Sequence, residues 1–230
     1  MRRYGFLKHS LVDYPGEVCS VVFMPGCNFH CAYCHNKNLL ASVHREGVFL
    51  KDIVSYLKDA GRRFVTGVCI TGGEPTLYPE TLSYLVSLFK EMNLKVKLDT
   101  NGSHPDQIRL LADRIDYFAM DLKTVPGRYV ELVNEGKDTI GTTIEESIQL
   151  LLSMPICRYE FRTTLSWQYV DEDVIDTLGK YMHRDTYWYL QKCRLENVKM
   201  DAKDVVAEYE RMSRCYQIAK HYTQHAHLRE

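Results

Sequence analysis

Segments of β-strand character alternate with segments of helical character along most of this chain. Apolar, β-branched runs are typical of strands, and apolar residues spaced by three or four are typical of helices. Strands are predicted at Val18–Met24, Val65–Thr71, Leu94–Asp99, Ile115–Asp121, Ile156–Leu165 and Thr186–Gln191. Helices are predicted at Leu50–Ala60, Pro79–Met92, Pro105–Ala112, Thr142–Leu152, Asp171–Tyr181 and Lys203–His221. Such alternation requires parallel strands joined by helical crossovers.

The number of strand–helix units limits the architecture. A complete barrel of eight units takes about 250 residues, and this chain has 230 residues and six predicted strands. We therefore predict an α/β fold, a partial (β/α)6 barrel of parallel strands that is open on one side. The length suits a single domain over residues 1–230, with a core at about 11–191 and a C-terminal helix and tail at about 201–230. We expect the histidine-bearing tail, Lys220–Glu230, to be solvated.

Charge and hydropathy exclude several classes of protein. A net charge of −1 does not support a basic field that would hold nucleic acid. No run approaches the roughly 18 consecutive apolar residues of a membrane span. The first residues, Met1–His9, begin basic but develop no apolar signal core. We therefore expect a cytoplasmic protein without nucleic-acid or membrane partners.

The eight cysteines are unevenly distributed. In a chain that is not exported, a disulfide framework would not persist. Five cysteines are isolated and mostly lie in apolar runs, where a free cysteine behaves as a small buried hydrophobe; these are Cys19, Cys69, Cys157, Cys193 and Cys215. Only Cys193, at the end of the last predicted strand, remains a candidate for another role.

The other three cysteines, Cys27, Cys31 and Cys34, form a C-x3-C-x2-C cluster that can converge on one soft metal centre. One interpretation is a structural zinc site with His30 or His35 as the fourth ligand. Zinc sites commonly use two separated cysteine pairs, however, and no second C-x2-C pair occurs. Three cysteines without a fourth suit an iron–sulfur cluster with one open iron, which the spacing favours.

Polar residues follow the predicted strands in turn. Ligands of parallel α/β folds bind beyond the carboxyl ends of strands, so these residues are candidates for one site. A glycine pair allows close approach of the backbone, a carboxylate can pair with an ammonium, and a cation can pair with a carboxylate. Each alone is typical of a turn, a helix cap or a solvated surface, and only their joint placement indicates a site. The candidates are Gly72, Gly73, Glu74, Asp99, Asp121, Lys123 and Arg162.

These motifs together resemble the radical S-adenosylmethionine (SAM) enzymes. The resemblance rests on the cysteine spacing, with Tyr33 before the last cysteine, and on Gly72-Gly73-Glu74-Pro75, and it spans Leu11 to about Gln191. Further segments resemble the activating-enzyme branch of that superfamily, and within it the type that activates anaerobic ribonucleoside-triphosphate reductase. They are Val12–Gly16, Gly26–Phe29, Tyr33–Asn36, Leu98–Gly102 and Met120–Lys123.

The resemblance implies two cofactors and a set of residues that bind them. Cys27, Cys31 and Cys34 would hold a [4Fe–4S] cluster whose fourth iron binds the amino and carboxylate groups of SAM. Tyr33 and the backbone around His35 match positions that contact the adenine. Gly72, Gly73 and Glu74 match the strip that receives the methionyl ammonium. Positions near the methionyl carboxylate and the ribose are matched by Asp99, Asp121, Lys123 and Arg162, although the two aspartates could instead share a cation.

In this branch the SAM-derived radical abstracts hydrogen from a glycine of a partner protein. The implied partners are a glycyl-radical enzyme, with anaerobic ribonucleotide reductase expected, and flavodoxin or ferredoxin as electron donor. A small-molecule radical SAM enzyme of the 7-carboxy-7-deazaguanine synthase type and a non-catalytic zinc-binding module are the alternatives. Cys69 is the only cysteine in the sequence between Asn36 and Thr71, so a second iron–sulfur cluster is not expected. The 126–141 loop could contact a partner or cap the barrel.

Overall fold

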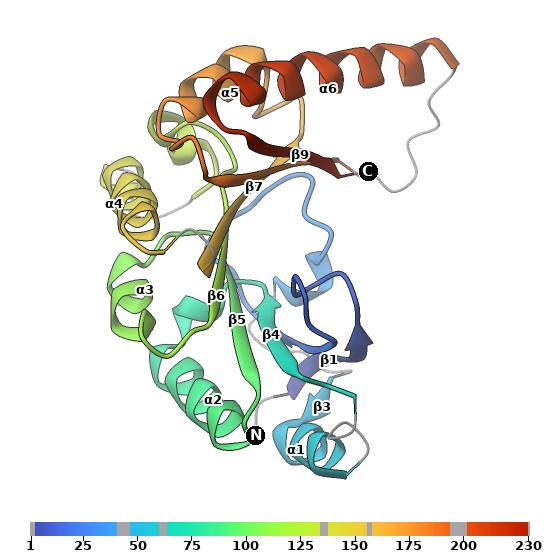
Figure 1. Ribbon diagram of the computed structural model, residues 1–230, viewed down its shortest axis with the longest axis vertical. Helices are drawn as coiled ribbons and strands as arrows, with labels where there is room; N and C mark the ends of the chain where they lie inside the picture. Colours follow the sequence, from blue (N-terminus) through green and yellow to red (C-terminus); the bar gives the residue numbers. More distant parts are fainter. Residues whose placement is uncertain are drawn as a thin grey trace. The chain divides into compact units, whose positions relative to one another are not determined.

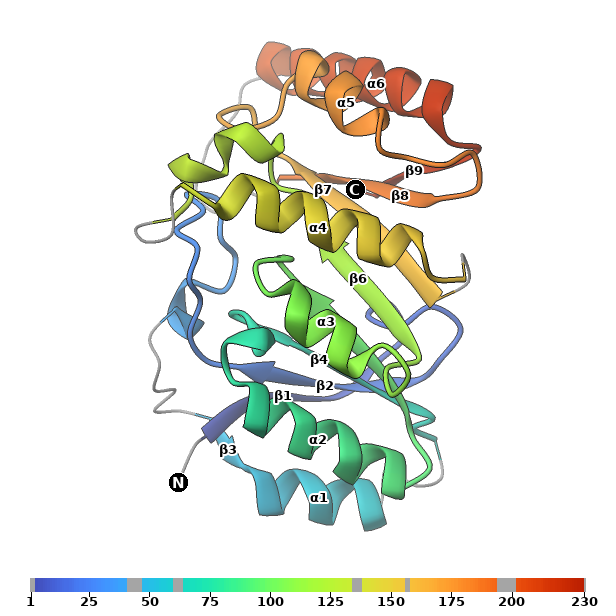
Figure 2. The same cartoon turned by 90° about the vertical axis from the view of Figure 1, so that its left-hand side faces the viewer.

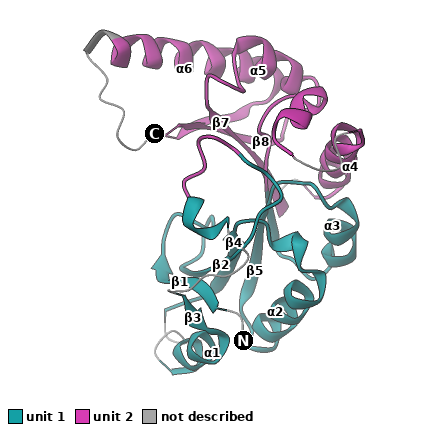
Figure 3. Ribbon diagram, turned by 180° about the vertical axis from the view of Figure 1, so that it is seen from behind, with its two compact units in different colours: residues 1–30, 36–119 teal, residues 31–35, 120–230 magenta. Residues whose placement is uncertain are grey.

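The computed structural model describes residues 3–40, 47–59, 64–133, 138–155, 158–193 and 202–229 (Figure 1). The chain divides into two compact units (Figure 3). The first unit contains residues 1–30 and 36–119, and the second contains residues 31–35 and 120–230. The cysteine loop therefore contributes to both units, with Cys27 in the first and with Cys31 and Cys34 in the second.

The first unit is built on parallel strands with one antiparallel flank. Strand β2 (Cys19–Met24) pairs in parallel with β4 (Gly67–Gly72), and β4 pairs in parallel with β5 (Lys95–Thr100). On the other side of β2, β1 (Arg3–Ser10) runs antiparallel and also pairs with β3 (Val48–Phe49). The described helices of this unit are η1 (Lys37–Leu39), α1 (Leu50–Asp59), η3 (Pro75–Leu77), α2 (Pro79–Glu91) and α3 (Pro105–Leu111).

Apolar residues at helical spacing explain how these helices pack. Helix α2 buries Leu82, Leu85 and Phe89 completely, and α1 buries Ile53. Strand β4 is buried through Ile70 and becomes partly exposed only at its carboxyl end. Figure 2 shows α2 and α3 in front of the strands of this unit. A strand that is covered along its length and open at its end presents its last residues to a ligand.

The second unit continues the same scheme. Strand β7 (Tyr159–Leu165) pairs in parallel with β8 (Tyr187–Lys192), which pairs in parallel with β9 (His225–Arg229). Among its described residues, the helices are η4 (Pro126–Glu131), α4 (Ile140–Leu152), α5 (Glu172–Gly179) and α6 (Ala202–Tyr222). Helices α5 and α6 pack against each other, and the two are visible side by side in Figures 1 and 2. The remaining strand, β6 (Tyr117–Asp121), carries the chain from the first unit into the second.

The predicted alternation is confirmed. Every predicted strand and helix is present, with ends shifted by a few residues, although Ala60, Ile156 and Cys157 lie outside the described residues. The strand order runs from β3 to β9 without returning to its start, so the strands do not close into a complete barrel. The expected count of six strands is too low, because β1, β3 and β9 were not predicted.

The expectation of a solvated C-terminal tail is wrong. Residues His225–Arg229 form β9, whose Ala226 is buried, while alternate side chains stack on β8. The rings of Tyr187 and His225 are stacked with centroids 4.5 Å apart, and those of Tyr189 and His227 with centroids 5.0 Å apart. The Arg229 guanidinium lies 3.4 Å from the Tyr189 ring centroid. The segment alternates polar with apolar residues, which is the pattern of a half-buried strand, and the sequence-based prediction missed it.

The isolated cysteines that the structure describes lie in the core, as predicted. Cys19, Cys69, Cys193 and Cys215 are all buried and none forms a disulfide. Burial raises the pKa of Cys193, so this thiol has no sign of activation. Among the described helices, none is long and apolar enough to cross a membrane.

Candidate functional site

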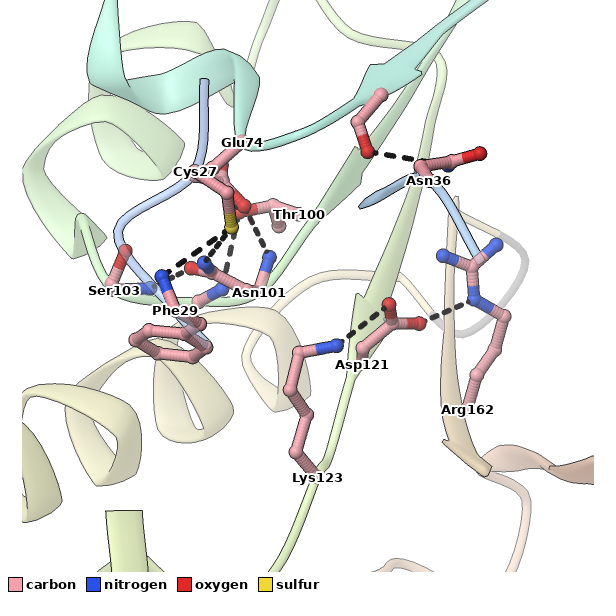
Figure 4. A network of polar contacts seen from close by, with 12 residues as sticks. Cys27, Phe29, Asn36, Glu74, Thr100, Asn101, Ser103, Asp121, Lys123 and Arg162 are labelled. Carbon is pink, nitrogen blue, oxygen red and sulfur yellow. Dashed lines mark hydrogen bonds and ion pairs between the residues drawn. The ribbon is translucent and has the colours of Figure 1, made fainter. Parts of the chain in front are cut away.

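The first cysteine of the loop is held by the end of β5. The amide N–H of Phe29 donates to Cys27 Sγ over 3.4 Å, and Asn101 Nδ2 lies 4.0 Å from the same sulfur (Figure 4). Phe29 is 1% exposed and anchors this part of the loop in the core. The Cys27 side chain itself is partly exposed. The loop therefore presents a thiol whose surroundings already supply hydrogen-bond donors to sulfur.

A short network fixes the loop to the β5–α3 connection. Asn101 Nδ2 donates to Asn28 Oδ1 (2.9 Å), and Asn28 Nδ2 donates to Ser103 Oγ (2.9 Å). The Ser103 amide in turn donates to Asn101 Oδ1 (2.9 Å), and Ser103 Oγ contacts His104 Nδ1 (2.9 Å). The cluster of amide and hydroxyl groups thus ties the segment around Cys27 to the end of β5.

The second and third cysteines belong to one turn in the second unit. The Cys34 amide donates to the Cys31 carbonyl over 3.0 Å, and both thiols are partly exposed. Burial raises the pKa of Cys31, and the nearby Lys123 ammonium opposes that rise. Between the two cysteines, Tyr33 packs against Tyr169, with ring centroids 5.9 Å apart. Burial also raises the pKa of Tyr33, whereas His35 is exposed to solvent.

The glycine pair brings two backbone segments of the first unit into contact. Gly72 has a φ of +123°, and a Cβ there would lie 2.4 Å from Met24 backbone atoms. At Gly73 a Cβ would lie 1.9 Å from the Gly26 carbonyl oxygen. The Gly73 amide donates to Met24 O (2.8 Å), and the Glu74 amide donates to Gly26 O (2.7 Å). Only glycine permits this approach of the β4 end to the start of the cysteine loop.

Glu74 is buried and its carboxylate is engaged by neighbouring donors. Its Oε1 accepts from the Thr76 amide (3.0 Å), Thr76 Oγ1 (2.5 Å) and Thr100 Oγ1 (2.9 Å), while Oε2 accepts from the Asn101 amide (2.6 Å). Burial raises the pKa of Glu74, and these hydrogen bonds oppose the rise. The side chain therefore braces the ends of β4 and β5 against each other. Its expected contact with a methionyl ammonium stays a prediction.

Replacing Glu74 with glutamine should destabilise the protein without its cofactors. The side-chain amide nitrogen of the introduced glutamine cannot accept a hydrogen bond, so it would face either the Asn101 amide or the donors of Thr76 and Thr100. A buried donor left without a partner costs about 1–3 kcal/mol, and we expect that decrease in the free energy of unfolding for Glu74→Gln. Urea denaturation measures it, with exposed Glu80→Gln as the control, expected within about 0.5 kcal/mol of wild type. Equal stability of the two variants would contradict this account of Glu74.

The carboxylate of Asp121 lies between two cations in the second unit. Arg162 Nε donates to Asp121 Oδ1 over 2.8 Å, and Lys123 Nζ lies 3.3 Å from Oδ2 (Figure 4). Burial acts to lower the pKa of Lys123, but Asp121, Tyr33 and Cys31 outweigh it, so this pKa is raised well above its ordinary value. Lys123 is thus a charged ammonium at neutral pH, enclosed by acidic groups.

The 126–141 loop contacts this charged group through a buried tyrosine. Tyr129 of η4 is fully buried, and its hydroxyl accepts a hydrogen bond from the Lys123 amide (2.9 Å). Arg128 pairs with Glu131 and donates to the Gln168 carbonyl (3.2 Å). The described part of the loop therefore covers Lys123, while residues 134–137 lie outside the described residues.

The structure gathers the candidates into two sets. In the first unit, hydrogen bonds connect Gly73 and Glu74 to the segment before Cys27, and Asn101 contacts both Cys27 and Glu74. Gly72 directly precedes Gly73, and Asp99 lies in β5, two residues before Asn101. In the second unit, Cys31, Tyr33, Asp121, Lys123 and Arg162 lie together. No group of three or more His, Cys, Asp or Glu side chains poised to hold a metal occurs among the described residues.

Sequence reasoning missed several members of the site. Asn28, Thr76, Asn101 and Tyr129 were not predicted to act, and they hold Cys27, Glu74 and Lys123 in place. Asn101-Gly102 is typical of a turn, which conceals the role of the Asn101 side chain. Burial of Thr76, Asn101 and Tyr129 is the signal that could have identified these three, but burial is not visible in one sequence.

A sequence profile described as the Radical SAM superfamily matches residues 21–154, more than half of the chain. The chain belongs to the radical SAM superfamily. It is therefore a radical SAM enzyme, and the cofactors of this family are a [4Fe–4S] cluster and SAM.

Three relatives of this radical SAM chain carry informative names. It is 33% identical over 183 residues to a protein of Methanocaldococcus jannaschii that is provisionally named a glycyl-radical enzyme activating enzyme, covering 76% of this chain and 73% of that protein. It is 31% identical to a pyruvate formate-lyase-activating enzyme of Clostridium pasteurianum, covering 50% of this chain and 49% of that one. It is 32% identical to a 7-carboxy-7-deazaguanine synthase of Clostridium acetobutylicum, covering 47% and 48%. Resemblance to the activating-enzyme branch is confirmed, whereas the anaerobic reductase type stays a prediction.

Solved structures share the fold of this radical SAM chain. A structure of TYW1 with a lysine-pyruvate adduct bound is 19% identical, with a TM-score of 0.60 over 89% of this chain and 74% of that chain. Streptococcus suis SuiB bound to S-adenosylmethionine is 17% identical, with a TM-score of 0.57 over 91% of this chain and 48% of that chain. The likeness covers both units and confirms the predicted α/β fold of the radical SAM enzymes.

The residues present fit the family's cofactors. Three of the seven described cysteines are partly exposed, and these are the three of the C-x3-C-x2-C loop; the other four are buried. Thiolates are the ligands of iron–sulfur clusters, so these three residues have the chemistry that the cluster requires. Beside Cys27, the glycine pair keeps the end of β4 free of side chains, as a ligand bound against the backbone there would require.

Proposed function

We propose that this radical SAM enzyme installs a glycyl radical in a partner protein, and that the partner is anaerobic ribonucleoside-triphosphate reductase. The observation that carries the proposal is the first relative, whose similarity covers about three quarters of both chains at 33% identity. The similarity to the 7-carboxy-7-deazaguanine synthase covers about half of each chain. A similarity that covers about three quarters of the chain favours the activating function over one that covers about half.

The residues of the site have distinct tasks in this proposal. Cys27, Cys31 and Cys34 hold the cluster. A cluster held there would supply the electron for reductive cleavage of SAM, and the hydrogen abstraction that follows would be the chemistry of the cofactors themselves. Tyr33 and the backbone at His35 contact the adenine. The protein's contribution is to orient SAM, to exclude water and to admit the substrate.

The glycine pair and the charged residues bind the methionyl group and the ribose of SAM in this proposal. Gly72 and Gly73 present backbone groups to the ammonium of SAM. Glu74 holds them in place through its hydrogen bonds to the end of β5. Lys123 and Arg162 attract the methionyl carboxylate, while Asp99 and Asp121 accept hydrogen bonds from the ribose or the ammonium. Arg162 and Lys123 also neutralise Asp121, so the set can face a zwitterion without a large net charge.

The proposal also includes a source of electrons for the cluster and a location in the cell. The four other described cysteines are buried, and we propose that an external one-electron donor, flavodoxin or ferredoxin, reduces the cluster. Such a cluster persists in a reducing, oxygen-poor compartment, and we infer a cytoplasmic location.

The test is whether a glycine-bearing partner accepts the radical. The protein is loaded anaerobically with iron and sulfide, reduced, and mixed with SAM and the candidate reductase. We expect a glycyl-radical signal in electron paramagnetic resonance spectra, formed together with 5′-deoxyadenosine. A reductase whose radical-bearing glycine is changed to alanine is the matched control and should give no signal. Turnover of a pterin-type small molecule without any protein partner would instead establish the synthase function, and uptake of zinc without iron would exclude both.

A further inference from the structure

A buried lysine, Lys97, lies next to the candidate site and has no role in the proposed function. Lys97 lies in the middle of β5, and its side chain is only 2% exposed. It is in register with Cys69 of β4, which is in register with Val21 of β2. Both neighbours are completely buried and belong to an apolar cluster with Tyr14. The Lys97 ammonium is therefore enclosed by the core of the first unit.

Burial of an ammonium requires compensation. Moving a charge out of water costs several kcal/mol, and a paired neighbour must recover it. The Lys97 ammonium pairs with Asp99 Oδ1, and its Nζ lies 3.9 Å from Cys69 Sγ. A buried ion pair is often no more stable than apolar residues of similar volume. Stability alone therefore does not account for a lysine at this position.

Asp99 connects this buried charge to the site. Two residues along the strand from Lys97, it projects from the same face of β5, and its side chain is 12% exposed. Two residues further on, Asn101 contacts both the Cys27 sulfur and the Glu74 carboxylate. The ion pair thus lies directly beneath the carboxyl end of β5.

We propose that Lys97 is a positioning residue for the cofactor: its ammonium fixes the Asp99 carboxylate for the hydrogen-bond donors of SAM. An aspartate has two rotatable bonds, and a cation on one carboxylate oxygen restricts both. The pair also has no net charge, so the core beneath the site stays neutral. The inference rests on the proposed contact of Asp99 with SAM and does not depend on which partner protein is activated.

The test is a double-mutant cycle on SAM affinity, measured by equilibrium dialysis without reductant on cluster-loaded protein. The variants are Lys97→Met, Asp99→Asn and the double variant. We expect each single variant to weaken SAM binding by about tenfold or more, as loss of a charge-assisted hydrogen bond does. The double variant should bind SAM about as weakly as Asp99→Asn, because Lys97 acts through Asp99.

Lys95→Met is the matched control, since Lys95 lies on the same strand but is 59% exposed and pairs with Glu17. It should bind SAM like wild type. A merely structural role for Lys97 predicts a lower melting temperature with unchanged SAM affinity, and that result would overturn the proposal. Additive effects in the double variant would also overturn it.

Two further outcomes are decisive. Lys97→Met could fail to fold, whereas the double variant buries no unpaired charge. In that case the SAM affinity of the double variant is compared with that of Asp99→Asn. If the double variant binds SAM at least threefold more weakly, Lys97 does not act through Asp99. If Asp99→Asn binds SAM like wild type, the inference fails at its premise. Neither result bears on glycyl-radical formation, which has its own readout.

Discussion

Cys31→Ala should abolish both the iron–sulfur cluster and the reductive cleavage of SAM. Cys31 is one of three partly exposed thiols in the loop, and the other described cysteines are buried in the core. A cluster held by three cysteines loses a third of its protein ligands on this change, and no fourth cysteine in the loop can take its place. We expect iron and sulfide content near background after anaerobic reconstitution, and no 5′-deoxyadenosine after reduction with SAM present.

Cys215→Ala is the control for this result. Cys215 is completely buried on α6 in the same unit as Cys31, and burial raises its pKa to about 12. Its replacement should leave the iron content and SAM cleavage at wild-type levels. The Cys31 variant should keep the wild-type circular dichroism, because its thiol is not part of the core. Full iron and sulfide content in the Cys31 variant would refute the ligand assignment.

The strand–helix order was predictable because it depends on local patterns. Burial on both faces makes β2 and β4 nearly continuous apolar runs, which a single sequence displays. Strand β5 is visible instead as an alternation of Val96 and Leu98 with charged residues. Strands β1 and β9 lack a continuous apolar run: three consecutive residues of β1 are exposed, and β9 alternates histidines and arginine with small or apolar residues. Their pairing with β2 and β8 is decided by tertiary contacts.

The sequence shows the candidate cysteines and the glycine pair, and it does not show the residues that hold them in place. Cysteine spacing and a glycine pair are visible in the sequence because the chemistry requires those residue types close together. The residues that hold them in place are distant in sequence. Asn101 contacts Cys27, 74 residues away, and Thr100 donates to Glu74, 26 residues away. Lys97 is likewise indistinguishable from an exposed strand lysine until its burial is known. Spacing in sequence carries no information about such contacts.

Gly73→Ala should displace the cysteine loop and prevent cluster loading. A Cβ at this position would lie 1.9 Å from the carbonyl oxygen and 2.5 Å from the carbonyl carbon of Gly26. Both are backbone atoms, so no rotamer change can relieve the overlap, and the segment that leads into Cys27 must move. The hydrogen bond from the Glu74 amide to Gly26 O (2.7 Å) would break with it. Overpacking of this kind costs about 1–3 kcal/mol, and sometimes more.

We therefore expect the free energy of unfolding of Gly73→Ala to fall by about 3 kcal/mol in urea denaturation, and iron content to fall steeply in parallel. Gly127→Ala is the matched control, because a Cβ there meets nothing within 4 Å, and it should load iron like wild type. Loss of iron at full stability would mean that Gly73 acts on the ligand alone. Wild-type iron content and stability together would show that the loop does not depend on this contact. The proposed function gives Gly73 a second task, in binding SAM, and measuring iron content together with stability separates the two tasks.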